Sequence, residues 1–172
     1  MSKRNQLIFR IIFISFTVIC MAVIFYFSHQ TGEESTAASE NVTSGITNII
    51  RPPDYENMTP QEQARYEYNL NILIRSNAHK LVYFTLAALV FCILLTVPEI
   101  NFTLKICITY FFCLFYAATD ELHQYFIPGR SGSVNDVLKD MHGVLIALIS
   151  VLVIYSVYKG IIFYKRKKLS LL

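Results

Sequence analysis

The sequence predicts an all-α integral membrane protein with about four transmembrane helices and a polar extracytoplasmic segment. Of its 172 residues, 54% are hydrophobic and 16% are charged, whereas about 25% are charged in an ordinary soluble domain. Four apolar stretches approach the length of about 20 residues that crosses a bilayer, and they cover residues 7–27, 81–97, 102–119 and 141–158. Basic residues also cluster at both ends of the chain. These observations together exclude a soluble globular domain.

The first apolar stretch is expected to be a retained signal anchor, because its apolar run is longer than that of a cleaved signal peptide. Lys3, Arg4 and Arg10 lie at its start, and a second basic cluster, residues 159–168, follows the last stretch. An even number of spans puts both clusters on one side, and Lys and Arg near span ends favour the cytoplasm. We therefore expect a multi-pass protein of the cell membrane with both termini cytoplasmic.

The basic clusters also suggest partners. A basic tail can bind nucleic acid, but a short basic run beside a span usually contacts anionic lipid headgroups. Membrane lipids are therefore the expected partners, and nucleic acid is not.

Residues 28–78 form the expected extracytoplasmic segment, the only sizeable polar part of the chain. Thr59 and Glu62 have the spacing of a capping box, and Pro60 occupies the first helical position, so a helix is expected to begin there. That helix can continue without a break into the second span. The segment 51–54, which contains two prolines, is expected to be extended or to turn.

The second and third spans should form an antiparallel helix pair, and the third span then leads outward to a loop and the fourth. Residues 98–101 make a short connection on the cytoplasmic side, and Pro and Gly within residues 128–133 should end the third helix. Ser133 is expected to cap the fourth helix, with Asp136 near its positive end. Gly143 then permits close approach to a neighbouring helix.

Ionisable and polar residues gather at the predicted outer ends of three spans. They are His79 of the second span, Asp120, Glu121, His123 and Gln124 of the third, and Arg130, Asp136 and Asp140 of the loop and fourth span. Charges at membrane depth are costly unless they are paired or functional. The spacing of Asp120 and His123, and of Asp136 and Asp140, puts each pair on one helix face. We therefore predict that His79, His123 and Asp136 approach one another in one polar site.

These residues also resemble the VanZ-like family. The resemblance runs through Asp120–Arg130, then Asp136, Asp140 and Gly143, with Arg75 and His79 upstream, and a weaker first motif at Ser28, Gln30, Ser35 and Ser39. Ser76 and Val82 stand where Lys and Glu are expected in the family, and Ala147 where a second Gly is common. The resemblance implies a small bacterial membrane protein associated with low-level resistance to teicoplanin-type glycopeptides, but it supplies no mechanism.

One hypothesis is an enzyme acting on a cell-envelope component at the extracytoplasmic face, such as an anionic lipid-linked wall precursor. Arg130 presents a planar fork that suits phosphate or carboxylate, and the other expected binding residues are Gln124, Asp136, Asp140 and Arg75. Protons can be exchanged by His and carboxylate side chains. The expected catalytic residues are Asp120, Glu121, His123 and His79.

Three alternatives remain open. The protein can be a non-catalytic binder that shields a lipid or precursor, or that changes access of a glycopeptide antibiotic to it. The ionisable residues can form a structural ion-pair network that fixes helix packing. A metal site built from His79, His123 and two carboxylates suits zinc or manganese, but its ligands come from separate helices, so no metal ligand is assigned. The sequence identifies no cofactor.

The predicted topology puts Ser39 and Ser131 outside the cell and Lys3 and Lys168 inside, because basic clusters flank an even number of spans. Single cysteines introduced at these positions in a cysteine-free variant should report it. An impermeant thiol reagent should label positions 39 and 131 on intact cells. Labelling of position 131 only after the cytoplasmic face is opened would contradict the topology.

Overall fold

The computed structural model describes residues 2–169, with side chains up to Arg166, and this part of the chain is helical without strands. Its elements are α1 (Lys3–Ser28), α2 (Gly32–Ile50), the short 3-10 helix η1 (Tyr55–Asn57), α3 (Pro60–Leu95), α4 (Phe102–Tyr125) and α5 (Val134–Leu169). Four of them, α1, α3, α4 and α5, are long and apolar enough to cross a membrane. The predicted all-α membrane fold is thereby confirmed. The side chains of Lys167 and Lys168 in the basic tail lie outside the described residues.

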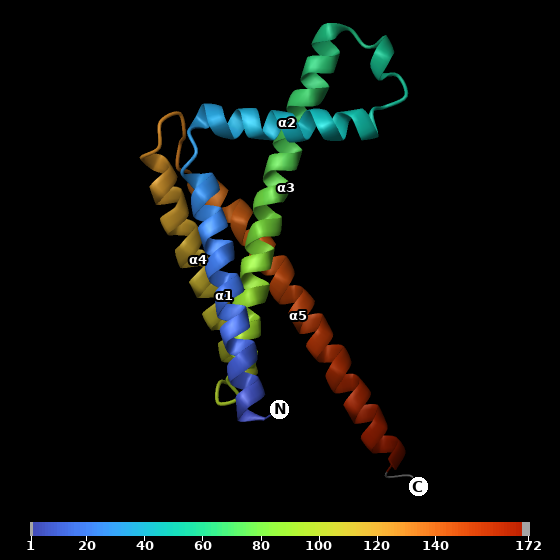
Figure 1. Ribbon diagram of the computed structural model, residues 1–172. Coiled ribbons are helices and arrows are strands. Elements are labelled where there is room, and N and C mark those ends of the chain that lie inside the picture. Colours follow the sequence, from blue (N-terminus) through green and yellow to red (C-terminus); the bar gives the residue numbers. More distant parts are fainter. Residues whose placement is uncertain (1, 170–172) are drawn as a thin grey trace.

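The four long helices form a bundle from which α5 diverges towards the C-terminus (Figure 1). Helix α3 is central, because it packs against α1, α2, α4 and α5. Helix α2 lies across one end of the bundle, and α3 extends beyond it into the loop that carries η1 (Figure 1). We call this end, which also carries the α4–α5 loop, the loop end. Both chain termini lie at the opposite end, the terminal end.

The interior of the bundle contains mostly small and medium apolar side chains, together with the large Tyr83 and Phe91 of α3. Leu86 and Ala87 of α3, Cys113 and Ala117 of α4, and Val144 of α5 are fully buried. Large apolar side chains cover the outer faces of the same helices and stay exposed. Such a distribution suits a bilayer, where small residues let helices approach and large apolar ones contact lipid.

Two capping boxes start the helices of the segment 28–78. Thr59 and Glu62 cap α3 as predicted, and α3 then runs for 36 residues into the apolar region without a break. Thr31 and Glu34 form a second capping box that starts α2, and the backbone and side-chain hydrogen bonds from Thr31 lower the pKa of Glu34. The sequence analysis missed α2, although the pattern Thr31-x-x-Glu34 is the local signal for it.

Helices α3 and α5 approach most closely at Gly143. A methyl group at this position would overlap the backbone carbonyl of Lys80 on α3. Gly143 itself is buried, so the two backbones are in contact where a larger side chain would separate them. The prediction that Gly143 permits close helix approach is confirmed. The contact lies next to Asp140, one turn earlier on α5.

Gly143→Ala should lower the free energy of unfolding by about 1–3 kcal/mol, because overpacking forces the helices apart. Gly160→Ala on the same helix is the matched control, since no atom lies near the position its Cβ would take. That control should be neutral or stabilising by up to about 1 kcal/mol through helix propensity. Thermal unfolding of both purified variants in detergent measures the difference. Equal melting temperatures for the two would contradict the proposed close contact.

Candidate functional site

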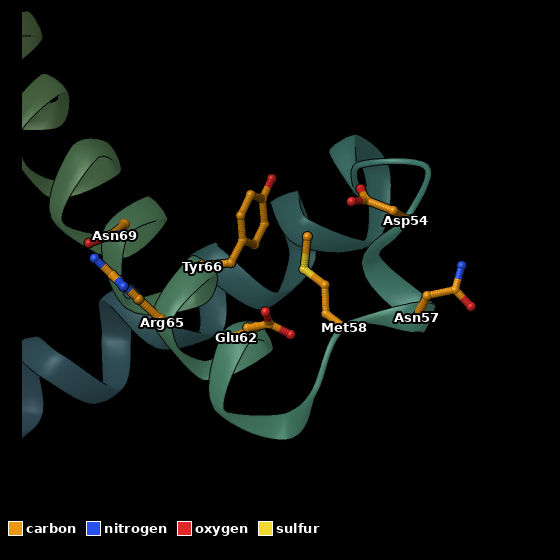
Figure 2. Close-up of a pocket in the computed structure, with 7 residues that line it drawn as sticks. All are labelled: Asp54, Asn57, Met58, Glu62, Arg65, Tyr66 and Asn69. Carbon is orange, nitrogen blue, oxygen red and sulfur yellow. The ribbon is translucent and has the colours of Figure 1, made fainter.

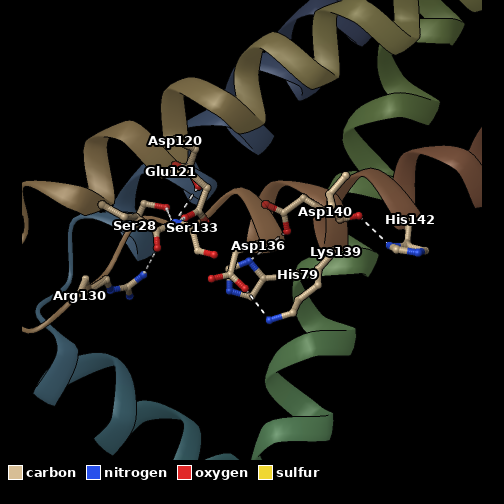
Figure 3. A network of polar contacts seen from close by, with 12 residues as sticks. Ser28, His79, Asp120, Glu121, Arg130, Ser133, Asp136, Lys139, Asp140 and His142 are labelled. Atoms are coloured by element: carbon tan, nitrogen blue, oxygen red, sulfur yellow. Dashed lines mark hydrogen bonds and ion pairs between the residues drawn. The ribbon is translucent and has the colours of Figure 1, made fainter.

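A polar pocket of about 310 Å³ lies between α3, α4 and α5 near the loop end. Its lining residues are Ile72, Arg75, Ser76 and His79 of α3, Glu121 and Gln124 of α4, and Asp136, Lys139 and Asp140 of α5. Figure 3 shows His79 extending towards Asp136 and Asp140, with Asp120 and Glu121 on the neighbouring α4. The structure thus brings together six of the nine predicted site residues. Asp120, His123 and Arg130 are not among the residues that line it.

His79 and Asp140 form the central pair of this pocket. The Nδ1 atom of His79 lies 3.4 Å from Oδ1 of Asp140, and the carboxylate is only 1% exposed, whereas the imidazole is 36% exposed. A carboxylate facing Nδ1 favours the tautomer with its proton on that nitrogen, which leaves Nε2 with a free lone pair. The second oxygen of Asp140, Oδ2, is buried and has no partner in the described part of the chain.

The pocket also holds cations. Lys139 contacts Asp136 at 2.5 Å, one turn apart on α5, and both side chains are partly exposed. Arg75 makes no ion pair with any residue that the structure describes, so its guanidinium is an open donor group in the wall formed by α3. The pocket therefore combines one unpaired cation with a buried acid.

The α3 wall includes residues that the sequence analysis did not assign to the site. Ile72, Ser76 and also Lys139 of α5 were missed. A signal for the first two was present, because positions 72, 75, 76 and 79 share one face of a helix at spacings of three and four. Because Arg75 and His79 were already assigned to the site, this spacing predicts that Ile72 and Ser76 lie beside them.

Glu121 connects α4 to the start of α5. Its Oε2 accepts a hydrogen bond of 3.0 Å from the backbone N–H of Ser133, and the Ser133 hydroxyl accepts one of 3.1 Å from the N–H of Asn135. Gly132 lies so close to the Glu121 carbonyl that a Cβ atom would overlap it. The predicted cap at Ser133 is confirmed, and Glu121 fixes the loop from which α5 begins.

Gln124, which lines the pocket, also joins three segments through its side chain. Its amide nitrogen donates to the Ser28 hydroxyl of α1 and to Oδ2 of Asp120, both at 3.1 Å. Its amide oxygen accepts a bond of 3.0 Å from Nη1 of Arg130. Asp120 and Gln124 are almost fully buried. We call Ser28, Asp120, Gln124 and Arg130 the Gln124 network.

The guanidinium of Arg130 donates hydrogen bonds to other groups of the protein. Besides Gln124, it donates through Nη2 to the Phe27 carbonyl at 2.9 Å, one of the carbonyls that a helix C-terminus leaves without an intrahelical partner. Burial and then the charge of Arg75 lower the pKa of Arg130; an Arg side chain nevertheless stays charged in a protein. Arg130 was expected to point into the predicted site. Its guanidinium instead hydrogen-bonds Gln124 and the Phe27 carbonyl, and so connects the α4–α5 loop to the end of α1.

His123 faces α1. Its Nε2 lies 3.4 Å from Nδ1 of His29, and its ring stacks on Phe25 with centroids 4.9 Å apart. The prediction that His123 meets His79 is wrong, since His123 lies two positions after Glu121 and therefore points to the opposite face of α4. Among the described residues, no group of three His, Cys, Asp or Glu side chains is placed to hold a metal ion.

A second pocket, of about 420 Å³, lies in the protruding hairpin of η1 and the start of α3 (Figure 2). Its lining residues are Asp54, Asn57, Met58, Glu62, Arg65, Tyr66 and Asn69. None of the predicted site residues lines it, and it is an open depression at the tip of the molecule. The chemistry expected from the sequence is concentrated in the first pocket.

Comparison with known proteins identifies the family. A family model described as VanZ/LLP1 matches residues 13–156. The chain belongs to this family. The match extends from α1 into α5 and includes every residue of the first pocket, and it supports a multi-pass VanZ-like membrane protein linked to teicoplanin resistance. No curated protein and no solved structure matches the chain.

In this VanZ-like protein, Arg130→Lys should reduce stability, because an ammonium cannot span Gln124 and the Phe27 carbonyl as the planar fork does. We expect a loss of about 1–3 kcal/mol, the value of a hydrogen bond to a charged group. Arg65→Lys, on the exposed part of α3, is the control and should be neutral. Thermal unfolding and membrane abundance measure both. If the Arg130→Lys variant is as stable as the wild type, then holding Gln124 and the Phe27 carbonyl at the same time does not contribute to the free energy of unfolding.

Proposed function

We propose that this VanZ-like protein binds a lipid-linked cell-envelope component at the extracytoplasmic face, through an anionic group of that component, and exchanges protons with it. The observation that carries the proposal is the placement of Arg75, which has no ion pair among the described residues, in the same pocket as the His79–Asp140 pair. A structural network would pair its cations, since an unpaired charge at membrane depth is costly. The pocket instead keeps one open cation beside an imidazole oriented by a buried acid.

Orientation follows from the distribution of charge and polar structure. Both termini lie at one end of the bundle, and Arg10 at that end donates to the hydroxyl and carbonyl of Thr96. Basic residues near span ends favour the cytoplasm, which supports a cytoplasmic position for the terminal end. The loop end, with α2 and the pocket, then faces outside, where envelope precursors are exposed.

The substrate class follows from the position and chemistry of the pocket. A head group can enter it at the end of the apolar helices while its acyl or prenyl chains stay among the exposed apolar side chains of the bundle. Arg75 would hold a phosphate or carboxylate through two parallel hydrogen bonds. Lys139 is already engaged by Asp136 and adds a second positive charge at the rim.

The acid–base roles fall to His79 and Asp140. Asp140 holds the imidazole through Nδ1, and Nε2 is the atom that would accept a proton from the bound group. Glu121 is held by the Ser133 N–H and shapes the wall. Arg130 and His123, which were expected in binding and catalysis, instead position the α4–α5 loop and the contact with α1.

A non-catalytic binder or shield is the second candidate. It is favoured by the Gln124 network, in which Asp120, Gln124 and Arg130 hydrogen-bond to each other, so that three of the predicted catalytic and binding residues are engaged within the protein. A binder would use Arg75 and the shape of the pocket, but it would not need proton exchange at His79. The two candidates therefore differ in their response to an uncharged replacement of that imidazole.

His79→Asn should abolish the antibiotic or envelope phenotype while abundance and melting temperature stay at wild-type values, because general acid–base catalysis contributes roughly 10²–10⁴-fold to a rate. His142→Asn is the control, since the His142 ring only contacts the Leu138 carbonyl of its own helix. Teicoplanin susceptibility and unbiased analysis of lipids and precursors measure the result. A His79→Asn variant that keeps the full phenotype would exclude proton exchange and leave the binder.

A further inference from the structure

The pocket carries unsatisfied groups of both signs. Arg75 is a cation without an ion pair in the described residues, and Asp140 presents a buried oxygen without a donor. We propose that the pocket takes a zwitterionic lipid head group, a phosphate beside a primary ammonium, in preference to a purely anionic one. This inference rests on the proposed function and names the class of head group that the pocket selects.

Of the three acids that line the pocket, Asp140 is the one with a buried oxygen that lacks a hydrogen-bond partner among the described residues. Asp136 is engaged by Lys139, and Glu121 accepts from the Ser133 backbone. Asp140 pairs through one oxygen with His79, while its Oδ2 has no partner although the residue is 1% exposed and lines the pocket. A buried acceptor without a donor costs free energy, so a donor carried by the ligand would be bound there.

The overall charge of the pocket also favours a ligand with a positive group. Two cationic side chains, Arg75 and Lys139, face three acids, Glu121, Asp136 and Asp140. A bare phosphate would be held by Arg75 but would also lie close to a buried carboxylate with no cation between them. An ammonium next to the phosphate removes this conflict, because it supplies positive charge and three N–H donors to the acid side.

The size of the pocket agrees with a head group and not with a whole lipid. Its volume of about 310 Å³ is at the lower end of ligand pockets in proteins. Arg75 lies on α3 and Asp140 on α5, so the two groups approach a ligand from different walls. Because both residues line this one small pocket, the proposed ligand carries its phosphate and its ammonium on a short linker.

The test compares lipids bound to the full-length protein in detergent by native mass spectrometry and thermal unfolding. Phosphatidylethanolamine supplies the phosphate and ammonium, and phosphatidylglycerol with the same acyl chains supplies the phosphate alone. We expect about tenfold tighter binding of phosphatidylethanolamine, the value of one hydrogen bond to a charged group. Equal binding, or tighter binding of phosphatidylglycerol, would overturn the inference.

Free phosphoethanolamine separates a lipid from a soluble source of the same chemistry. It should bind at least about tenfold more weakly than the lipid, because it lacks chains that can be buried against the exposed apolar helices. Binding as tight as that of the lipid would assign the pocket to a soluble ligand and overturn the lipid assignment.

Variants of Asp140 and Arg75 test which of the two residues determines the preference for phosphatidylethanolamine. Asp140→Asn should remove the preference for phosphatidylethanolamine and keep binding of phosphatidylglycerol, whereas Arg75→Gln should weaken both. Asp54→Asn and Arg65→Gln, which carry the same changes outside the pocket, should match the wild type. An Asp140→Asn variant that folds and keeps the preference would overturn the inference. The wild-type lipid comparison decides the question even if that variant does not fold.

Failure of this inference can be told apart from failure of the proposed function. If phosphatidylglycerol binds as well as phosphatidylethanolamine and Arg75→Gln weakens both, the head-group selectivity is wrong and binding at the pocket stands. If no lipid is retained, or Arg75→Gln retains every lipid as the wild type does, then the proposed lipid site is wrong and this inference with it.

Discussion

The loop end of this protein depends on the side chain of Gln124. One amide connects Ser28 at the end of α1, Asp120 on α4 and Arg130 in the α4–α5 loop. At this depth water is scarce, so each buried polar group must find its partner within the protein. The amide is suited to this role because it both donates and accepts. Without it, a carboxylate and a guanidinium would be left buried without a shared neutral partner.

This network separates structural polar residues from those available to a ligand. Arg130 and Asp120 satisfy one another through Gln124, while Arg75, His79 and Asp140 lie in the neighbouring pocket with unused hydrogen-bonding capacity. Both sets are ionisable and close in space. The Nε atom of Arg130 is also buried without a partner among the described residues, but neither Arg130 nor Asp120 lines the pocket. The division explains how a single cluster of charges can both hold helices together and form a site.

The packing of α5 sets the geometry of the pocket. Its contact with α3 at Gly143 lies just below Asp140 and brings that acid to His79. Val144, Ala147 and Leu148, just beyond this contact, are still buried. Farther along, α5 diverges from the bundle (Figure 1), and most of its apolar side chains there are exposed. A membrane protein can tolerate such divergence because lipid tails cover the separated faces. The backbone contact at Gly143 thus lies beside the site, while farther along α5 the ring of Tyr155 still stacks on Phe102 of α4 with centroids 3.9 Å apart.

The sequence alone determined the helical membrane fold, the caps at Thr59 and Ser133, the close approach at Gly143 and the gathering of ionisable residues at one end. These features depend on composition and on residues a few positions apart, so local rules predict them. Helix α2 was missed despite the Thr31 signal. Only the tertiary structure decided which ionisable residues share the pocket, because the rotation of α4 against α1 and α5 is set by packing between distant segments. That rotation directs His123 to α1, while the contact between α3 and α5 pairs Asp140 with His79.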